Sequence, residues 1–202
     1  PSLNKPQKVF TLIFLINKNK ILLGYKKRGF GKGNWDGFGG KIEENDATIR
    51  DAALRELEEE CQVGEIPENN PFQCFGRMFF NYNEALAKEI FVVWLFRAFI
   101  TEENEAFINE QVKETEEMKP EWFDPENVPY DCMWPDSEHW VPQFINLMKK
   151  EDFETGIQGY FNFPETFHAV DRFLVEQVPN GVEIFTKEME ASNRGKINKF
   201  LH

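Results

Sequence analysis

The sequence has no run of about 18 apolar residues, so it contains no segment that could span a bilayer as a helix. Residues 1–8 are polar and contain neither the apolar core nor the cleavage site of a secretory signal. Cysteine is scarce: Cys61, Cys74 and Cys132 are widely spaced and do not form the paired pattern of a metal site. We therefore expect a reduced, cytoplasmic protein with no membrane association.

Basic residues are fewer than acidic ones. Lysine and arginine number 23 against 35 acidic residues, which gives a net charge of −12 and disfavours binding to a nucleic acid polymer. The basic residues are nevertheless concentrated in one segment that holds a single acid, Asp36: Lys20, Lys26, Lys27, Arg28, Lys32 and Lys41. This distribution favours a compact anionic ligand, with a bound cation offsetting the acidic residues elsewhere.

The chain length of 202 residues suits one well-packed domain, and hydrophobic residues make up 41% of it, including 21 Phe. The apolar runs predict strands over residues 9–16, 21–24, 73–82, 89–100, 121–123, 159–163 and 169–178, and helices over 48–61 and 137–150. Residues 29–40 are rich in glycine and predict a loop or bulged strand. Residues 64–70 and 101–115 are polar and predict surface loops.

Strands and helices alternate without regular βαβ units, which favours an α/β fold with a mixed sheet between helices. We place the domain at residues 8–182 and a C-terminal tail at 183–202. The polar residues from at least 190 to 202 predict a mobile or loosely attached segment.

The predicted helix over 48–61 carries the main functional signal. Thr48 and Asp51 have the spacing of a capping box at its start. At 3.6 residues per turn, Glu56, Glu59 and Glu60 fall within an arc of roughly 100° that continues an apolar stripe from the preceding turns. A solvated acidic face is the ordinary alternative. Carboxylates on an inward face repel one another and are costly to desolvate, so the pattern favours a hard divalent cation such as Mg²⁺.

Gly39-Gly40-Lys41-Ile42-Glu43-Glu44, followed by Arg55-Glu56-Leu57-Glu58-Glu59-Glu60, strongly resembles the Nudix box. The resemblance implies a Nudix hydrolase with an α/β/α sandwich fold. It also implies that Glu56, Glu59 and Glu60 bind metal, and that Arg55 holds the loop to the helix. The match departs from the box at Ala47, where a Glu is expected, and at Gln62, where a Gly is expected. Asp46 or Glu44 is the candidate replacement for the missing Glu.

The segments 22–42, 116–123, 133–140 and 159–163 are similar to the eukaryotic MutT-homologue branch of the family, which hydrolyses oxidised purine nucleoside triphosphates such as 8-oxo-dGTP and 2-hydroxy-dATP. This resemblance implies that Gly39, Gly40 and Lys41 lie beside the phosphates, with Gly40 also in the metal site. Glu117 corresponds to an acid that helps bind metal or activate water. Trp134 corresponds to an aromatic that stacks on the base, and Asp136 to an acid that contacts the base edge. The remaining implied pocket residues are Thr11, Lys26, Phe30 and Phe80. Core packing or surface exposure is the alternative for each.

Two departures fall on base-contacting positions. Asp36 replaces an Asn of this branch, and Ser137 replaces an Asp. An ionised carboxylate only accepts hydrogen bonds, whereas an amide also donates. We therefore expect a weaker preference for 8-oxoguanine and better use of adenine-type or N6-modified bases. If Asp36 and Asp136 lie close together, however, one of them would have a raised pKa and restore guanine recognition.

The sequence therefore predicts a magnesium-dependent hydrolase, with Mn²⁺ as an alternative metal, that releases a monophosphate and pyrophosphate. Glu59, Glu60, Glu56 and Glu117 are the candidate catalytic residues, and the choice of general base stays open. We expect a monomer acting on a small nucleotide in the cytoplasmic, nuclear or mitochondrial pool. The alternatives are a Nudix hydrolase of an ordinary dNTP or a dinucleoside polyphosphate, a nucleotide-binding regulator with little turnover, and a protein-interaction module.

Overall fold

The computed structural model describes residues 5–199, and the side chains of residues 5–193. Its centre is an eight-stranded sheet in the order β3-β2-β1-β5-β4-β7-β8, with β6 also paired to β2. The strands are β1 (Gln7–Asn17), β2 (Lys20–Lys26), β3 (Trp35–Asp36), β4 (Phe72–Tyr82), β5 (Ile90–Ile100), β6 (Met118–Phe123), β7 (Gly156–Phe163) and β8 (Arg172–Val178). Most of the predicted strands are therefore present, several of them longer than the apolar runs suggested.

The sheet is mixed, as predicted. β1 pairs with β5 and β4 pairs with β7 in parallel, while the remaining pairs are antiparallel. The glycine-rich segment after β3 runs along β1 through isolated bridges at Phe38 and Lys41. These bridges bring residues 38–41 against the middle of the sheet.

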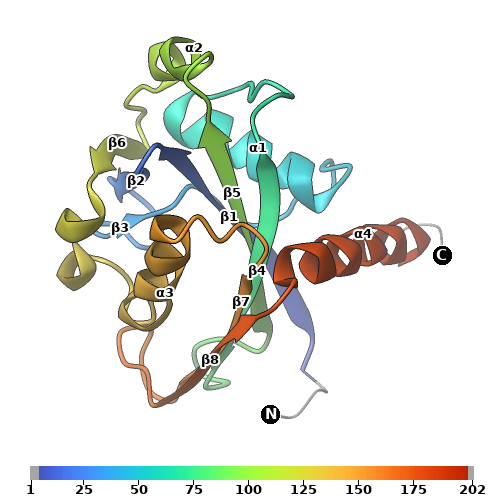
Figure 1. Cartoon of the computed structure of the whole chain (residues 1–202). Coiled ribbons are helices and arrows are strands. Elements are labelled where there is room, and N and C mark those ends of the chain that lie inside the picture. Colours follow the sequence, from blue (N-terminus) through green and yellow to red (C-terminus); the bar gives the residue numbers. More distant parts are fainter. Residues whose placement is uncertain (1–4, 200–202) are drawn as a thin grey trace.

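Helices cover both faces of this sheet (Figure 1). α1 (Ile49–Cys61) and α4 (Gly181–Lys199) pack on one side around Trp94, Phe96 and Phe185, and α3 (Ser137–Lys149) packs on the other around Phe75 and Phe144. Two short 3₁₀ turns, Pro125–Asn127 and Tyr130–Cys132, precede α3. The α/β/α sandwich is thus confirmed.

Thr48 caps the start of α1, as the spacing predicts, although Asp51 bonds the Thr48 hydroxyl and not the backbone N–H of a full capping box. Thr48 Oγ1 accepts a hydrogen bond from Asp51 N at 3.1 Å and donates to the Asp51 carboxylate at 2.8 Å. At the other end, Gln62 is the C-cap and has a left-handed backbone with φ +64°. The Nudix box has Gly at this position, because glycine adopts the left-handed conformation at a helix end without a steric penalty.

Residues 101–115 were predicted to be a surface loop, but they contain the helix α2 (Glu105–Gln111). Ile108 is fully buried and anchors this helix to the core beside α1. The prediction failed because only Ile108 and Val112 of this acidic segment pack against the core, while Phe107 is exposed, and two such residues give no visible periodicity.

The expectation of a loosely attached tail does not hold for the residues up to 193. α4 begins at Gly181, so the boundary at 182 falls inside it, and Phe185 and Met189 are buried in the core. Asn193 Oδ1 accepts a hydrogen bond from Ile49 N at 3.0 Å, which satisfies a donor at the start of α1. Residues 200–202 lie outside the described part.

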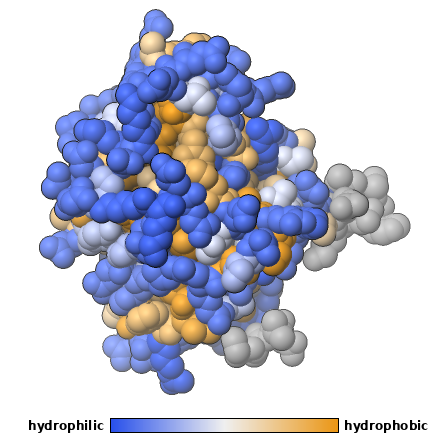
Figure 2. Space-filling model, viewed as in Figure 1, coloured by the Kyte–Doolittle hydropathy of each residue, from blue (hydrophilic) through white to orange (hydrophobic). Residues whose placement is uncertain are grey.

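Within residues 5–199, no helix is long and apolar enough to cross a membrane. Figure 2 shows mainly hydrophilic residues on one face, with apolar patches between them. The exposed apolar side chains include Phe173 and Leu174 of β8, each 52% exposed.

Candidate functional site

The acidic residues of α1 differ in burial. Glu60 is 1% exposed, and the Glu56 side chain is 13% exposed, so both face the protein as the helical arc predicts. Glu59 does not follow that prediction, because its side chain is 55% exposed. It lies at one edge of the arc, next to the solvent-exposed face of α1.

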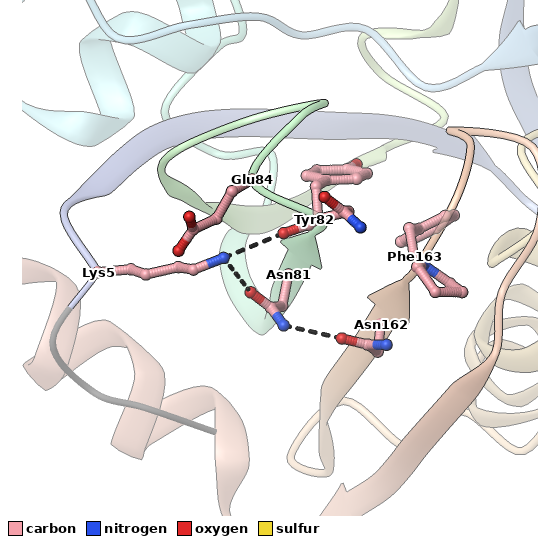
Figure 3. Close-up of a pocket in the computed structure, with 8 residues that line it drawn as sticks. Lys5, Asn81, Tyr82, Glu84, Asn162 and Phe163 are labelled. Atoms are coloured by element: carbon pink, nitrogen blue, oxygen red, sulfur yellow. Dashed lines mark hydrogen bonds between the residues drawn. The ribbon is translucent and has the colours of Figure 1, made fainter.

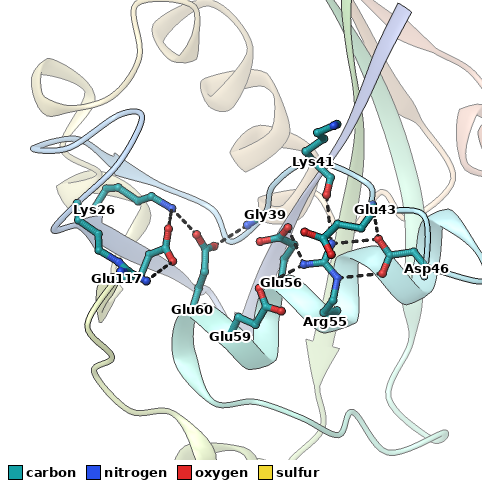
Figure 4. Close-up of polar contacts among 11 residues, drawn as sticks. Lys26, Gly39, Lys41, Glu43, Asp46, Arg55, Glu56, Glu59, Glu60 and Glu117 are labelled. Atoms are coloured by element: carbon teal, nitrogen blue, oxygen red, sulfur yellow. Dashed lines mark hydrogen bonds and ion pairs between the residues drawn. The ribbon is translucent and has the colours of Figure 1, made fainter.

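Lys26 of β2 joins Glu60 to Glu117 (Figure 4). Its Nζ lies 2.6 Å from Glu60 Oε1 and 2.8 Å from Glu117 Oε1. Gly39 N donates to the second Glu60 oxygen at 2.7 Å, and Arg28 Nη2 lies 3.3 Å from Glu117 Oε2. The structure therefore brings together a box glutamate, the predicted acid outside the box, the predicted pocket residue Lys26 and the predicted phosphate-side residue Gly39.

Arg55 holds the glycine-rich loop to α1, and Asp46 is its main partner. The guanidinium donates to both Asp46 oxygens, at 2.9 and 3.0 Å, and to Lys41 O at 3.1 Å. Two parallel hydrogen bonds of this kind are strong and directional. Of the two candidate replacements for the Glu absent at Ala47, the contacts favour Asp46, while Glu44 is exposed.

Among the described residues, no three acidic, histidine or cysteine side chains converge on a point that could hold a metal ion as they stand. Basic groups separate them: Arg55 Nη1 lies between Glu56, at 2.9 Å, and Glu59, at 3.2 Å. Lys26 holds Glu60 in the same way.

The donor set nevertheless fits a divalent cation. Burial raises the pKa of Glu60 to about 7 despite the nearby Lys26, and burial also raises the pKa of Glu56. The positive charges of Lys26 and Arg55 therefore do not fully offset the burial of these two carboxylates. Gly40 lets the Glu56 carboxylate lie against its backbone, because a Cβ there would lie 2.5 Å from Glu56 Oε1. Carboxylate and backbone oxygens are the ligands that Mg²⁺ and Mn²⁺ prefer.

One cavity of about 560 Å³ reaches this carboxylate network at Lys26 and Glu117, while Glu56, Glu59 and Glu60 are not among its lining residues. All the predicted substrate-binding residues line it: Thr11, Lys26, Phe30, Asp36, Gly39, Gly40, Lys41, Phe80, Trp134, Asp136 and Ser137. Thr11 is 2% exposed, and its hydroxyl has no hydrogen-bond partner among the described residues. A buried hydroxyl without a partner at a cavity wall is suited to a polar group of a ligand.

At the far end of the cavity, Asp36 and Asp136 interact electrostatically. Burial, followed by the charge of Asp136, raises the pKa of Asp36 to about 8. Burial raises the pKa of Asp136 to about 6, although Trp140 Nε1 donates to its carboxylate at 2.9 Å. At neutral pH, Asp36 therefore carries a proton and can donate a hydrogen bond.

Several cavity residues escaped prediction. Tyr82, Phe163 and Phe167 line the base end, as does Trp140. Trp140 follows Asp136 by four positions on α3, a spacing that could have indicated their contact. Phe167 lies in the loop after β7 and has no such signal.

A second, more open hollow of about 410 Å³ lies at the ends of β4 and β7 (Figure 3). Lys5 Nζ donates there to Asn81 Oδ1 at 3.3 Å and to Tyr82 O at 3.1 Å. Its lining contains one carboxylate, Glu84, and none of the box residues. It therefore lacks the carboxylate set of the first cavity.

Comparison with known proteins gives matches over most of the chain. A family model described as the NUDIX domain matches residues 5–144. The oxidized purine nucleoside triphosphate hydrolase of Mus musculus is 34% identical over 158 residues, covering 78% of this chain and 88% of that protein. The protein of the same name from Danio rerio is 36% identical over 164 residues, covering 77% and 86%.

Among solved structures, the MutT protein from Bacillus halodurans superposes with a TM-score of 0.54 at 18% identity. The match covers 84% of this chain and 97% of that protein. At this level of identity, the likeness supports the fold alone.

Proposed function

This chain belongs to the NUDIX domain family, and we propose from that premise that it hydrolyses modified purine nucleoside triphosphates to the monophosphate and pyrophosphate. The two relatives named above are oxidized purine nucleoside triphosphate hydrolases. The observation that carries the proposal is the single cavity. It joins the Glu60–Lys26–Glu117 network to a base-sized end bounded by Trp134 and Asp36.

Glu56, Glu59, Glu60 and Glu117, with the backbone of Gly40, would hold Mg²⁺ or Mn²⁺ in this proposal. When bound, the metal neutralises phosphate charge and acidifies a water molecule. Backbone N–H groups near Gly39 and the Lys41 side chain face the phosphates. A carboxylate accepts the proton of the attacking water while the new P–O bond forms and the anhydride bond to pyrophosphate breaks. Glu59, Glu60 and Glu117 are the candidates for that base.

The protonated Asp36 adjusts the expected base preference. A carboxyl group donates as well as accepts, so at neutral pH Asp36 can contact the O6 of 8-oxoguanine as an amide would. Ionised Asp36 only accepts and suits the amino group of adenine. We therefore propose that guanine-type and adenine-type modified purines are both substrates at neutral pH, and that the preference shifts towards adenine-type bases as the pH rises.

We propose that the chain acts as a monomer. The net charge of −12 opposes a nucleic acid polymer as the substrate. A role in clearing modified nucleotides requires access to the nucleotide pool, and we propose the cytoplasm as the compartment.

The test is hydrolysis by the purified chain with Mg²⁺ of 8-oxo-dGTP, 2-hydroxy-dATP, N6-methyl-dATP and the four ordinary dNTPs. Chromatography resolves the nucleoside products, and separate assays detect pyrophosphate and orthophosphate. We expect monophosphate and pyrophosphate from the modified purines. Preferred hydrolysis of an ordinary dNTP or a dinucleoside polyphosphate would redirect the substrate assignment, and binding without turnover would favour a regulator.

Glu59→Gln tests the carboxylate assignment, with Glu58→Gln as the matched control. Both residues are exposed neighbours on α1 and both changes remove one negative charge, but Arg55 pairs with Glu59 and has no hydrogen bond or ion pair with Glu58 among the described residues. Glu59→Gln should lower kcat by orders of magnitude at unchanged stability, while Glu58→Gln stays near wild type. Near-normal turnover of Glu59→Gln would refute the role of Glu59.

A further inference from the structure

The mouth of the cavity is built from aromatic rings of three separate segments. Phe30 comes from the glycine-rich loop, Trp134 from the segment before α3, and Phe167 and His168 from the loop 164–171 between β7 and β8. We call these four residues the aromatic lid. Two of its members, Phe167 and His168, lie outside every motif that indicated the site.

The rings of the lid contact one another directly. Phe30 stacks on Trp134 with centroids 4.9 Å apart and planes 28° apart. Phe167 packs edge-on against Phe30, with ring centroids 5.3 Å apart, and lies tilted against Tyr82 at 4.8 Å. His168 stacks on Trp134 at 5.9 Å. The loop after β7 thus contacts both halves of the Phe30–Trp134 stack.

A base that stacks on Trp134 beneath Phe30 needs more room than this arrangement gives. Two stacking gaps of about 3.5 Å separate the outer rings by roughly 7 Å, compared with 4.9 Å here. Phe30 is 62% exposed, and it precedes Gly31, whose φ is +84°. A Cβ on Gly31 would lie 2.9 Å from Trp134 Cζ2, so only glycine allows the loop to approach the indole this closely.

We propose that Phe167 is a specificity-determining residue of the base pocket, which closes with Phe30 over a purine stacked on Trp134. Phe167 lines the cavity, is half-buried, and braces Phe30 from the side. An apolar wall at the mouth is covered by the second ring of a purine, whereas a pyrimidine is too short to reach it. The loop 164–171 would therefore select purines by size and by stacking. This inference rests on the proposed function.

The test compares Phe167→Ala with Phe173→Ala as the matched control. Phe173 is an exposed Phe that stacks on His139 and does not line the cavity. Binding of dGMP, dAMP and dCMP is measured by calorimetry without metal, and KM and kcat are measured separately with Mg²⁺. Phe167→Leu keeps apolar volume without a ring and therefore serves as the variant less prone to a folding defect. Thermal unfolding is measured for all variants.

Phe167→Ala should weaken purine binding and raise the purine KM roughly tenfold, with kcat and dCMP binding little changed. Phe167→Leu should show a smaller loss of the same kind, and Phe173→Ala none. Purine affinities within twofold of wild type, or equal losses for dGMP and dCMP, would overturn the inference. If the wild-type chain hydrolyses nothing but the binding pattern is as expected, the hydrolase proposal fails and the role of Phe167 stands.

Discussion

Asp36→Asn separates the effect of the Asp36 proton on base recognition from all other ionisations in the enzyme. With a pKa of about 8, Asp36 is protonated in about nine-tenths of molecules at pH 7 and in about one-tenth at pH 9. Only the protonated form donates to O6 of 8-oxoguanine. The kcat/KM for 8-oxo-dGTP should therefore fall roughly tenfold between these two pH values, relative to that for N6-methyl-dATP.

The asparagine variant donates at every pH. Its kcat/KM for 8-oxo-dGTP, divided by that for N6-methyl-dATP, should therefore not show the part of the decrease that is due to Asp36. The assay is kcat/KM for both substrates from pH 6 to 9 in the two enzymes. The ratio cancels the ionisation of catalytic groups, and the comparison of enzymes cancels the ionisation of the bases themselves. A wild-type ratio that is flat over this range, or an equal fall in Asp36→Asn, would refute the assignment.

The same pKa shift has a consequence for stability. Asp36 binds its proton more tightly in the folded chain than in the unfolded one, where the pKa is near 3.8. Its contribution is therefore complete below pH 4, is lost as the pH rises from 4 to 8, and is constant above. Asp36→Asn should thus melt at the wild-type temperature near pH 4 and several degrees higher at pH 8, measured without nucleotide. A difference independent of pH would contradict the raised pKa.

Two further predictions concern the departures from the box. Gln62→Gly should raise the free energy of unfolding in urea by about 0.5–1 kcal/mol, because Gln62 has φ +64°. A lower free energy of unfolding would show that the Gln62 side chain has a compensating contact. Asp46→Ala should lower kcat/KM at least tenfold in the Mg²⁺ assay, because Arg55 loses its bidentate partner beside the glycine-rich loop, whereas Glu44→Ala, at an exposed position, should be silent. Equal effects of the two changes would exclude Asp46 as the replacement for the missing Glu.

Local patterns predicted the parts of the fold that depend on near neighbours. The N-cap at Thr48, the strands and the inward direction of Glu56 and Glu60 all follow from spacing along the chain. The α2 helix could not be predicted in this way, because its single buried residue, Ile108, finds its partners in distant elements. α4 was missed for the same reason: of the apolar residues in this largely polar segment, Phe185 and Met189 are buried, and their partners lie in distant elements.

In the candidate site, too, the features set by near neighbours in the sequence were predicted and those set by distant elements were not. Residue types and spacing indicated the inward carboxylates of α1, whereas the candidate cavity residues, and Asp46 as one of two replacements, came from the resemblance to the Nudix family. They did not predict that Lys26 would lie between Glu60 and Glu117, because β2, α1 and β6 meet only in the folded sheet. They also gave no sign of Phe167, whose loop has no counterpart in the motifs.

The chemistry of Asp36 shows why a substitution cannot be interpreted from residue type alone. Replacing an amide by a carboxylate normally removes a donor and adds a charge, which argues against guanine. The fold reverses that argument, since burial, followed by the charge of Asp136, raises the pKa of Asp36 to about 8 and keeps its proton at neutral pH. The pair therefore retains the hydrogen-bonding capacity of an amide and gains a pH dependence that an amide cannot have. In this proposal, guanine recognition thus depends on the burial of Asp36 and on its electrostatic interaction with a residue far along the chain, and both are properties of the fold.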